Sequence, residues 1–173
     1  MSSTLKVWIS AFRLRTLPLA LSAILMGTLL ADLYSFADPS IFLMASLTAI
    51  LLQILSNLAN DYGDFEKGTD NENRVGNTRA MQSGNITNPA MISMIVVFTC
   101  LSFTCGISLL YIAFKGNISL PFLAFLVTGI AAIVSSITYT MGKRAYGYRG
   151  WGDFFVFIFF GPVAVLGTFL LHH

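Results

Sequence analysis

Five of the eight acidic residues of this chain lie in one stretch, "LSNLANDYGDFEKGTDNENRVGNTRAMQSG", which spans residues 55–84. If the apolar helix at its start continues through it, Asn57, Asn60, Asp61 and Asp64 fall on one helical face. Two carboxylates that close repel each other unless a cation lies between them. Ligands that are all oxygens favour a hard ion such as Mg²⁺, which normally also carries substrate phosphates. The stretch therefore predicts a Mg²⁺ site at the end of a helix.

Basic residues follow the acids in the same stretch and again in a later polar segment: Arg74, Arg79, Lys143, Arg144 and Arg149. Arginine and lysine donors beside a Mg²⁺ ion are typical of a diphosphate site. Gly63 and Gly68 are expected to let the backbone turn and bring Glu66 or Asp70 back toward the helix end. The alternative is a solvated loop whose charges only mark membrane topology.

The composition of the whole chain indicates an integral membrane protein. The 173 residues are 55% hydrophobic and only 10% charged, whereas a soluble domain has about 25% charged residues. Five apolar runs are each long enough to cross a hydrocarbon core of ~30 Å; they span about 17–36, 40–59, 90–114, 119–141 and 153–171. We therefore predict an all-α, multi-pass transmembrane helical bundle over residues 1–173, with longer polar loops at 60–88 and 142–152.

Charge predicts the orientation of this bundle. Nine of the ten basic residues fall in the N-terminal segment and the two longer loops, which five crossings place on one side. The positive-inside rule makes that side cytoplasmic, so the N-terminus is expected inside the cell membrane. Arg13 and Arg15 are assigned to this topological role, and only Lys115 falls on the opposite side. The expected surroundings are the lipid bilayer, with no nucleic-acid partner.

Several motifs resemble one known family. "NDYGDFEKGTD" is similar to the first aspartate-rich motif of the UbiA superfamily of intramembrane aromatic prenyltransferases. "RLRTLPLA", "RAMQSGNIT" and "YTMGKRAYGYRGWGDFFVFIFFGPVAVLGT" resemble its 1,4-dihydroxy-2-naphthoate polyprenyltransferase branch, which serves menaquinone synthesis. The resemblance implies transfer of a polyprenyl chain from polyprenyl diphosphate to 1,4-dihydroxy-2-naphthoate with decarboxylation, giving demethylmenaquinone. Polyprenyl diphosphate and the naphthoate are thus the expected substrates, and Mg²⁺ the expected cofactor.

The resemblance also implies site residues. Asn60, Asp61 and Asp64 would hold Mg²⁺, with the two aspartates counted as catalytic. Catalytic roles also fall to Lys143, on the diphosphate, and to Tyr139, near the reacting carbon. The substrate-binding set is completed by Asn57, Asp70, Arg79 and Asp153. The third acid of the motif, Asp70, stands two residues later than in the general superfamily pattern, where this chain has Gly68.

The family has roughly nine transmembrane helices and a second aspartate-rich motif, which this sequence lacks. We therefore expect the chain to be the N-terminal part of the enzyme, with half of the metal–diphosphate site missing. Three alternatives remain open at this point: another aromatic-acceptor prenyltransferase of the superfamily, a non-enzymatic transporter, or an assembly subunit. An intramembrane CDP-alcohol phosphotransferase fits less well, because Phe65 and Glu66 follow Asp64 where that class has glycine.

Overall fold

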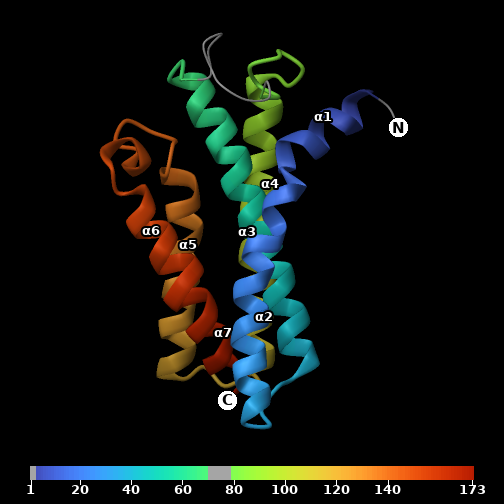
Figure 1. The fold of residues 1–173 in the computed structure, drawn as a ribbon, viewed down its shortest axis with the longest axis vertical. Helices are drawn as coiled ribbons and strands as arrows, with labels where there is room; N and C mark the ends of the chain where they lie inside the picture. Colours follow the sequence, from blue (N-terminus) through green and yellow to red (C-terminus); the bar gives the residue numbers. More distant parts are fainter. Residues whose placement is uncertain (1–2, 70–78) are drawn as a thin grey trace.

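The computed structural model describes residues 3–69 and 79–173, in which every regular element is helical (Figure 1). Within these residues, five stretches are long and apolar enough to span a membrane, which confirms the prediction of an all-α, multi-pass bundle. The elements are α1 (Ser3–Phe12), the 3₁₀ turn η1 (Leu14–Thr16), α2 (Leu17–Leu33), α3 (Pro39–Glu66), α4 (Asn88–Ala113), α5 (Leu120–Thr138), the 3₁₀ turn η2 (Tyr146–Arg149), α6 (Gly152–Ile158), the π-helical turn η3 (Phe159–Val163) and α7 (Ala164–His172).

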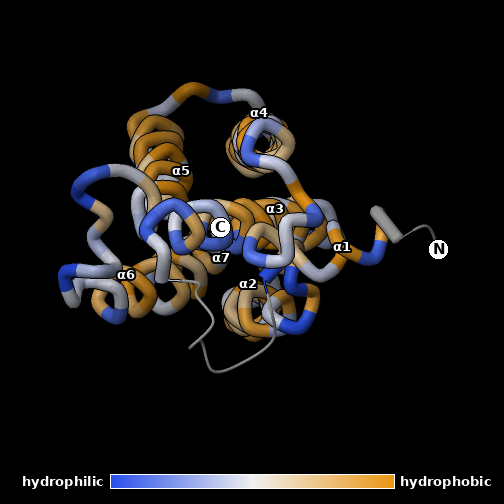
Figure 2. Tube along the Cα trace, turned by 90° about the horizontal axis from the view of Figure 1, so that it is seen from above, coloured by the Kyte–Doolittle hydropathy of each residue, from blue (hydrophilic) through white to orange (hydrophobic). Residues whose placement is uncertain are grey.

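Helix α3 is the centre of the bundle. It packs against α2, α4, α5 and α1, and Figure 2 shows it between α2 and α4. Asp38 caps its N-terminus by accepting a hydrogen bond of 2.7 Å from the Ser40 backbone N–H, and Pro39 occupies the first turn. The backbone N–H of Ser40 lowers the pKa of the Asp38 carboxyl. The short link of residues 34–38 joins α2 to α3 at this end.

At its other end α3 is longer than the sequence predicts. It continues to Glu66, whereas the apolar run ends near Ala59 and the loop was expected from Asn60. The expected turn at Gly63 is wrong, because Gly63 is buried inside the helix. A Cβ atom there would lie 2.6 Å from Thr140 Oγ1 and 2.7 Å from the Thr140 carbonyl carbon. Gly63 thus permits close contact with the segment after α5, and the chain turns at Gly68, whose φ is 68°.

The fifth crossing is not a regular helix. It joins α6 and α7 through the π-helical turn η3, which contains Pro162. Its last part packs closely on α2, since a Cβ atom on Gly27 would lie 2.8 Å from Thr168 Cβ. Residues of this irregular crossing form part of a cavity wall.

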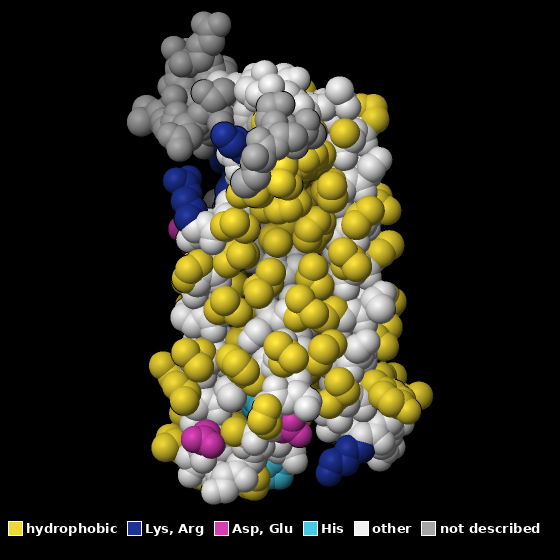
Figure 3. All heavy atoms as spheres, turned by 90° about the vertical axis from the view of Figure 1, so that its right-hand side faces the viewer, with side chains coloured by type: hydrophobic (Ala, Val, Ile, Leu, Met, Phe, Trp, Pro, Cys, Tyr) yellow, Lys and Arg dark blue, Asp and Glu magenta, His cyan; other side chains and the backbone are white. Residues whose placement is uncertain are grey.

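The outer surface is apolar, as a lipid-facing surface should be. On the face shown in Figure 3, hydrophobic side chains cover the middle and charged side chains lie toward both ends. We call the end at which α3 terminates and α4 begins the charged end; it is uppermost in Figure 1. A core cluster beneath it includes Leu55, Leu58, Met81 and Met91. This core holds the last turns of α3 in place.

Candidate functional site

The last turns of α3 carry a group of ion pairs. The Asp61 side chain is almost completely buried, with 2% of its surface exposed. Its Oδ1 atom lies 3.8 Å from Arg13 Nη2 and 3.7 Å from Arg79 Nη1. Arg79 Nη2 lies 3.5 Å from Asp64 Oδ2. Two guanidinium groups from distant parts of the sequence therefore meet the two carboxylates that the sequence analysis placed on one helical face.

Arg13 reaches this group because the first crossing is broken there. The residue adopts a left-handed backbone conformation (φ 50°, ψ 55°) between α1 and η1. Asn57 of α3 holds both sides of the break, since its Nδ2 atom donates hydrogen bonds of 2.9 Å to the Phe12 carbonyl and to Thr16 Oγ1. The charge pattern of the sequence predicts only a topological role for Arg13. The available signal was the buried helix face of Asp61, because a carboxylate buried there needs a cationic partner.

The segment that follows α5 is attached to the same end of α3. Thr140 Oγ1 donates a hydrogen bond of 3.0 Å to the Ala59 carbonyl and lies 3.1 Å from Asn60 Oδ1. Lys67 Nζ donates to the carbonyls of Thr140 (2.6 Å) and Gly142 (3.1 Å). These contacts bring the two polar segments of the sequence together.

Tyr148 completes that junction. Its hydroxyl donates a hydrogen bond to Asp64 Oδ1, and its ring lies under the Lys67 ammonium, 4.5 Å from ring centroid to Nζ. The sequence indicates only a topological role for Lys67 and no role for Thr140 or Tyr148. No local sequence pattern predicts these contacts. Lys67 and Thr140 bond to backbone carbonyls of distant segments, and Tyr148 reaches Asp64 only because the segment after α5 folds back onto α3.

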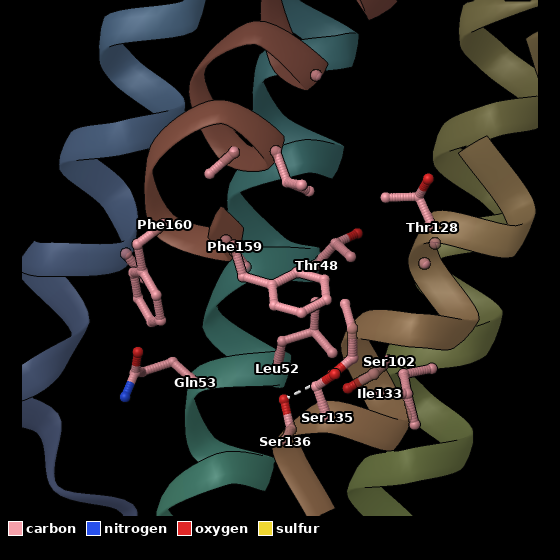
Figure 4. Close-up of a pocket in the computed structure, with 18 of the residues that line it drawn as sticks. Thr48, Leu52, Gln53, Ser102, Thr128, Ile133, Ser135, Ser136, Phe159 and Phe160 are labelled. Carbon is pink, nitrogen blue, oxygen red and sulfur yellow. Dashed lines mark hydrogen bonds between the residues drawn. The ribbon is translucent and has the colours of Figure 1, made fainter. Parts of the chain in front are cut away.

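A cavity of about 680 Å³ opens beside these residues. Asn57, Asn60 and Tyr139 line it, together with many apolar side chains. Figure 4 shows Phe159 and Phe160 reaching into it from the fifth crossing, opposite Leu52 and Gln53 of α3. The cavity thus joins a polar mouth at the charged end to an apolar interior.

Polar atoms also lie within this cavity wall. Gln53 Oε1 and Ser102 Oγ are buried and have no hydrogen-bond partner among the described residues. Buried polar atoms of this kind are costly unless a ligand or water satisfies them. Two tyrosines form the wall near the mouth, with the ring centroids of Tyr139 and Tyr146 5.3 Å apart.

The Tyr146 hydroxyl is fixed as a hydrogen-bond donor. It donates a bond of 2.9 Å to the Ser135 carbonyl of α5. Burial, reinforced by the neighbouring Tyr139, raises the pKa of Tyr146 to about 12, although the bond to Ser135 acts in the opposite direction. Tyr146 therefore stays neutral near pH 7.

Comparison with known proteins now identifies the fold. Residues 20–173 match the UbiA prenyltransferase family. The chain belongs to this family. It is 44% identical to the 1,4-dihydroxy-2-naphthoate octaprenyltransferase of Escherichia coli over 98% of this chain and 54% of that protein. Identity to the enzyme of the same name from Haemophilus influenzae is also 44%, over 96% of this chain and 54% of the relative.

More distant relatives share the name. Identity is 37% to the 1,4-dihydroxy-2-naphthoate octaprenyltransferase of Mycobacterium tuberculosis, over 93% of this chain and 52% of that protein. The chain thus spans about half the length of these relatives. No solved structure matches it. The membership agrees with the resemblance that the aspartate-rich motif indicated.

Not every residue predicted from the UbiA resemblance lies in the group around Asp61. Lys143 and Asp153 are exposed, and neither lines the cavity; Asp61, Asp64 and Arg79 are not among its lining residues either. Asp153 lies in the first turn of α6, where an acidic side chain interacts favourably with the helix dipole. Asp70 and Arg74 fall outside the described residues. The structure brings together Asn57, Asn60, Asp61, Asp64 and Arg79 and leaves Lys143 and Asp153 at the surface.

The donors at the end of α3 suit the metal expected in this UbiA protein. Among residues 3–69 and 79–173, no three His, Cys, Asp or Glu side chains form a cluster that could hold a metal alone. Asp61 and Asp64, with the amide oxygen of Asn60, are hard oxygen donors of the kind that Mg²⁺ prefers. Mg²⁺ is usually held by one or two carboxylates plus substrate phosphates. The residues present therefore fit an incomplete protein shell for Mg²⁺.

Proposed function

We propose that this protein transfers a polyprenyl chain from a polyprenyl diphosphate to 1,4-dihydroxy-2-naphthoate, with loss of the ring carboxylate, to give demethylmenaquinol, the reduced form of demethylmenaquinone. The observation that carries the proposal is the cavity of about 680 Å³, which is mostly apolar and is lined by Asn57 and Asn60 of the helix turns that also carry Asp61 and Asp64. An isoprenoid tail requires an apolar interior of this kind, and its diphosphate requires a neighbouring group of charged side chains that can hold a metal ion. Relatives at 37–44% identity are named 1,4-dihydroxy-2-naphthoate octaprenyltransferase, which supports the same substrates.

In this reaction the bond between C1 of the prenyl chain and the diphosphate oxygen breaks, and its electron pair leaves with the diphosphate. A carbon of the electron-rich naphthoate ring forms the new bond to C1 and releases its proton. The ring carboxylate leaves as CO₂, and a proton takes its place on the ring. Asn60, Asp61 and Asp64 would hold Mg²⁺, which offsets the charge that grows on the departing diphosphate. Arg79 and Lys143 would donate hydrogen bonds to the diphosphate oxygens. Asp70 is the remaining residue predicted to bind substrate beside this group.

The cavity wall would protect the cationic character that develops on C1. Tyr139 and Tyr146 present aromatic rings near the mouth, and Phe155 lies 4.3 Å from Tyr146 between ring centroids. Aromatic faces stabilise nearby positive charge, and an apolar wall excludes the water that would capture it. Asn57 holds the first crossing against α3 and so shapes the mouth, while Asp153 is proposed to act near the second polar segment.

We further infer that the charged end faces the cytoplasm, in the cell membrane. Lys6, Arg13 and Arg15 precede the first crossing, and Lys67, Arg79 and the residues 143–149 lie at the same end. A concentration of basic residues in short segments beside the crossings is typical of the cytoplasmic side. Both polyprenyl diphosphate and the naphthoate would then enter from the inner leaflet or the cytoplasm.

The test is an assay of the intact protein in proteoliposomes with octaprenyl diphosphate, 1,4-dihydroxy-2-naphthoate and Mg²⁺, with the product detected by mass spectrometry. Asp61→Asn combined with Asp64→Asn should lower the rate by at least about 100-fold. Asp32→Asn is the matched control, because it removes an exposed acid at the C-terminal end of α2, away from the charged end. Undiminished activity in the double variant would contradict the metal assignment. Transfer to 4-hydroxybenzoate in place of the naphthoate would indicate another aromatic acceptor.

A further inference from the structure

The carboxylates of Asp61 and Asp64 already carry cationic partners. Arg13 and Arg79 lie within 3.8 Å of Asp61 Oδ1, and Arg79 also lies 3.5 Å from Asp64 Oδ2. The side chains of both arginines are mostly buried, with 19% and 16% of their surfaces exposed. Their charges are therefore only weakly screened by solvent. Two carboxylates and two guanidiniums form a nearly neutral group.

A metal ion arriving alone would meet this group at a disadvantage. A divalent cation placed on Asp61 and Asp64 would lie beside two fixed positive charges, and their mutual repulsion would oppose its binding. A diphosphate arriving alone would compete with the carboxylates for the same guanidiniums. Together the two ligands exchange partners, because the metal takes the carboxylates while the diphosphate takes the arginines. Guanidinium groups bind phosphate oxygens through two parallel hydrogen bonds, which favours this exchange.

Arg13 is positioned for this role by the fold. Its backbone adopts a left-handed conformation that is unfavourable for any residue with a Cβ atom. The Thr16 hydroxyl donates a bond of 2.9 Å to the Arg13 carbonyl, and Asn57 bonds to Phe12 before the break and to Thr16 after it. Figure 1 shows the end of α1 meeting α2 beside α3. Several hydrogen bonds thus fix the break in the first crossing, and this conformation places the Arg13 guanidinium beside the buried carboxylate of Asp61.

We propose that Arg13, acting with Arg79, is an internal counter-cation that makes Mg²⁺ and a diphosphate bind cooperatively, and that Arg13 passes from Asp61 to the diphosphate when they bind. This inference rests on the proposed function, which supplies the two ligands. It assigns to the first crossing a diphosphate-binding residue outside the aspartate-rich stretch. It also defines a measurable quantity, the factor by which each ligand raises the affinity for the other, which must be the same in both directions.

The experiment measures binding rather than turnover. Mn²⁺ serves as the metal probe, followed by electron paramagnetic resonance of the free ion, and methylenediphosphonate serves as the diphosphate probe. Titrations of the intact protein in detergent are corrected for the complex that the two probes form without protein. The diphosphonate should raise the affinity for Mn²⁺ by at least about tenfold, within the usual range of coupling between sites.

Variants assign this coupling to Arg13. Arg13→Gln should bind Mn²⁺ alone more tightly than the wild type and should lose most of the coupling. Arg15→Gln removes the same charge from an exposed position two residues away and should behave as the wild type. If Arg13→Gln and Arg15→Gln show the same coupling, the proposal is wrong. It is equally wrong if the wild type binds Mn²⁺ as tightly without the diphosphonate as with it.

A charge-conserving variant keeps the proposal testable if Arg13→Gln does not fold. Arg13→Lys retains the counter-charge on Asp61 but lacks the two-pronged guanidinium, so it should keep the wild-type affinity for Mn²⁺ alone and bind the diphosphonate about fivefold more weakly with Mn²⁺ present. Unchanged diphosphonate affinity would overturn the role of Arg13. Prenyl transfer with no coupling would refute this inference alone, whereas absence of prenyl transfer with coupling intact would refute only the proposed function.

Discussion

The two polar regions of the charged end differ in how their functional residues are held. At the end of α3, Asp61 and Asp64 are paired with arginines, and Asn57 is bonded to the first crossing. In the segment after α5, Lys143 and Asp153 are exposed, although the backbone of that segment is tied to α3 through Lys67. The acids are therefore part of the folded core, while the cation of the second segment is left available to a ligand. Substitutions in the first region should cost stability, and those in the second should cost mainly binding.

The largest difference is expected between Asp61→Asn and Asp153→Asn. The first change leaves Arg13 and Arg79 close together and mostly buried without the central carboxylate. Breaking a buried ion pair in this way costs on the order of 3 kcal/mol in the free energy of unfolding. Asp153 is exposed, so Asp153→Asn should change the free energy of unfolding by no more than about 0.5 kcal/mol. Unfolding of the intact protein in mixed micelles, followed by tryptophan fluorescence, gives both values. Equal losses would remove the distinction between the two regions.

Features that depend on local sequence could be predicted, whereas features that depend on distant segments could not. Apolar runs of 19 to 25 residues predict membrane helices from length alone, and one-face spacing predicts that Asn57, Asn60, Asp61 and Asp64 lie together. The end of α3 was predicted too early because hydropathy falls at Asn60, while helix formation there depends on tertiary partners. Those partners, Arg13 and Thr140, come from distant segments, and nothing in local spacing indicates them.

Gly63 shows why a glycine in the sequence does not by itself predict a turn. Glycine in a polar segment suggests a turn, and for Gly68 that interpretation is correct. Gly63 instead lies within α3, and its missing side chain makes room for Thr140. Both uses of glycine produce the same letter in the sequence, so only the positions of neighbouring segments distinguish them.

A substitution at each glycine sharpens this comparison. Gly63→Ala would place a Cβ atom 2.7 Å from the Thr140 carbonyl carbon, which requires the two segments to move apart. Overpacking of this kind costs about 2 kcal/mol. Gly68→Ala meets no atom within 4 Å and pays only for its positive φ, about 1 kcal/mol. The unfolding titration used for Asp61→Asn measures both costs. A larger loss for Gly68→Ala would show that α3 and the segment after α5 are not closely packed at Gly63.

The smallest expected effect concerns Lys143. Because this side chain is exposed, Lys143→Met should leave the free energy of unfolding within about 0.5 kcal/mol of the wild type. If Lys143 binds the diphosphate, the loss of one charged hydrogen bond should raise KM for octaprenyl diphosphate about tenfold. Lys115→Met removes an exposed lysine at the opposite end of the bundle and should change neither quantity. Unchanged KM and kcat in Lys143→Met would remove Lys143 from the site, and a loss of stability would show that the second segment, like α3, uses its charges to fold.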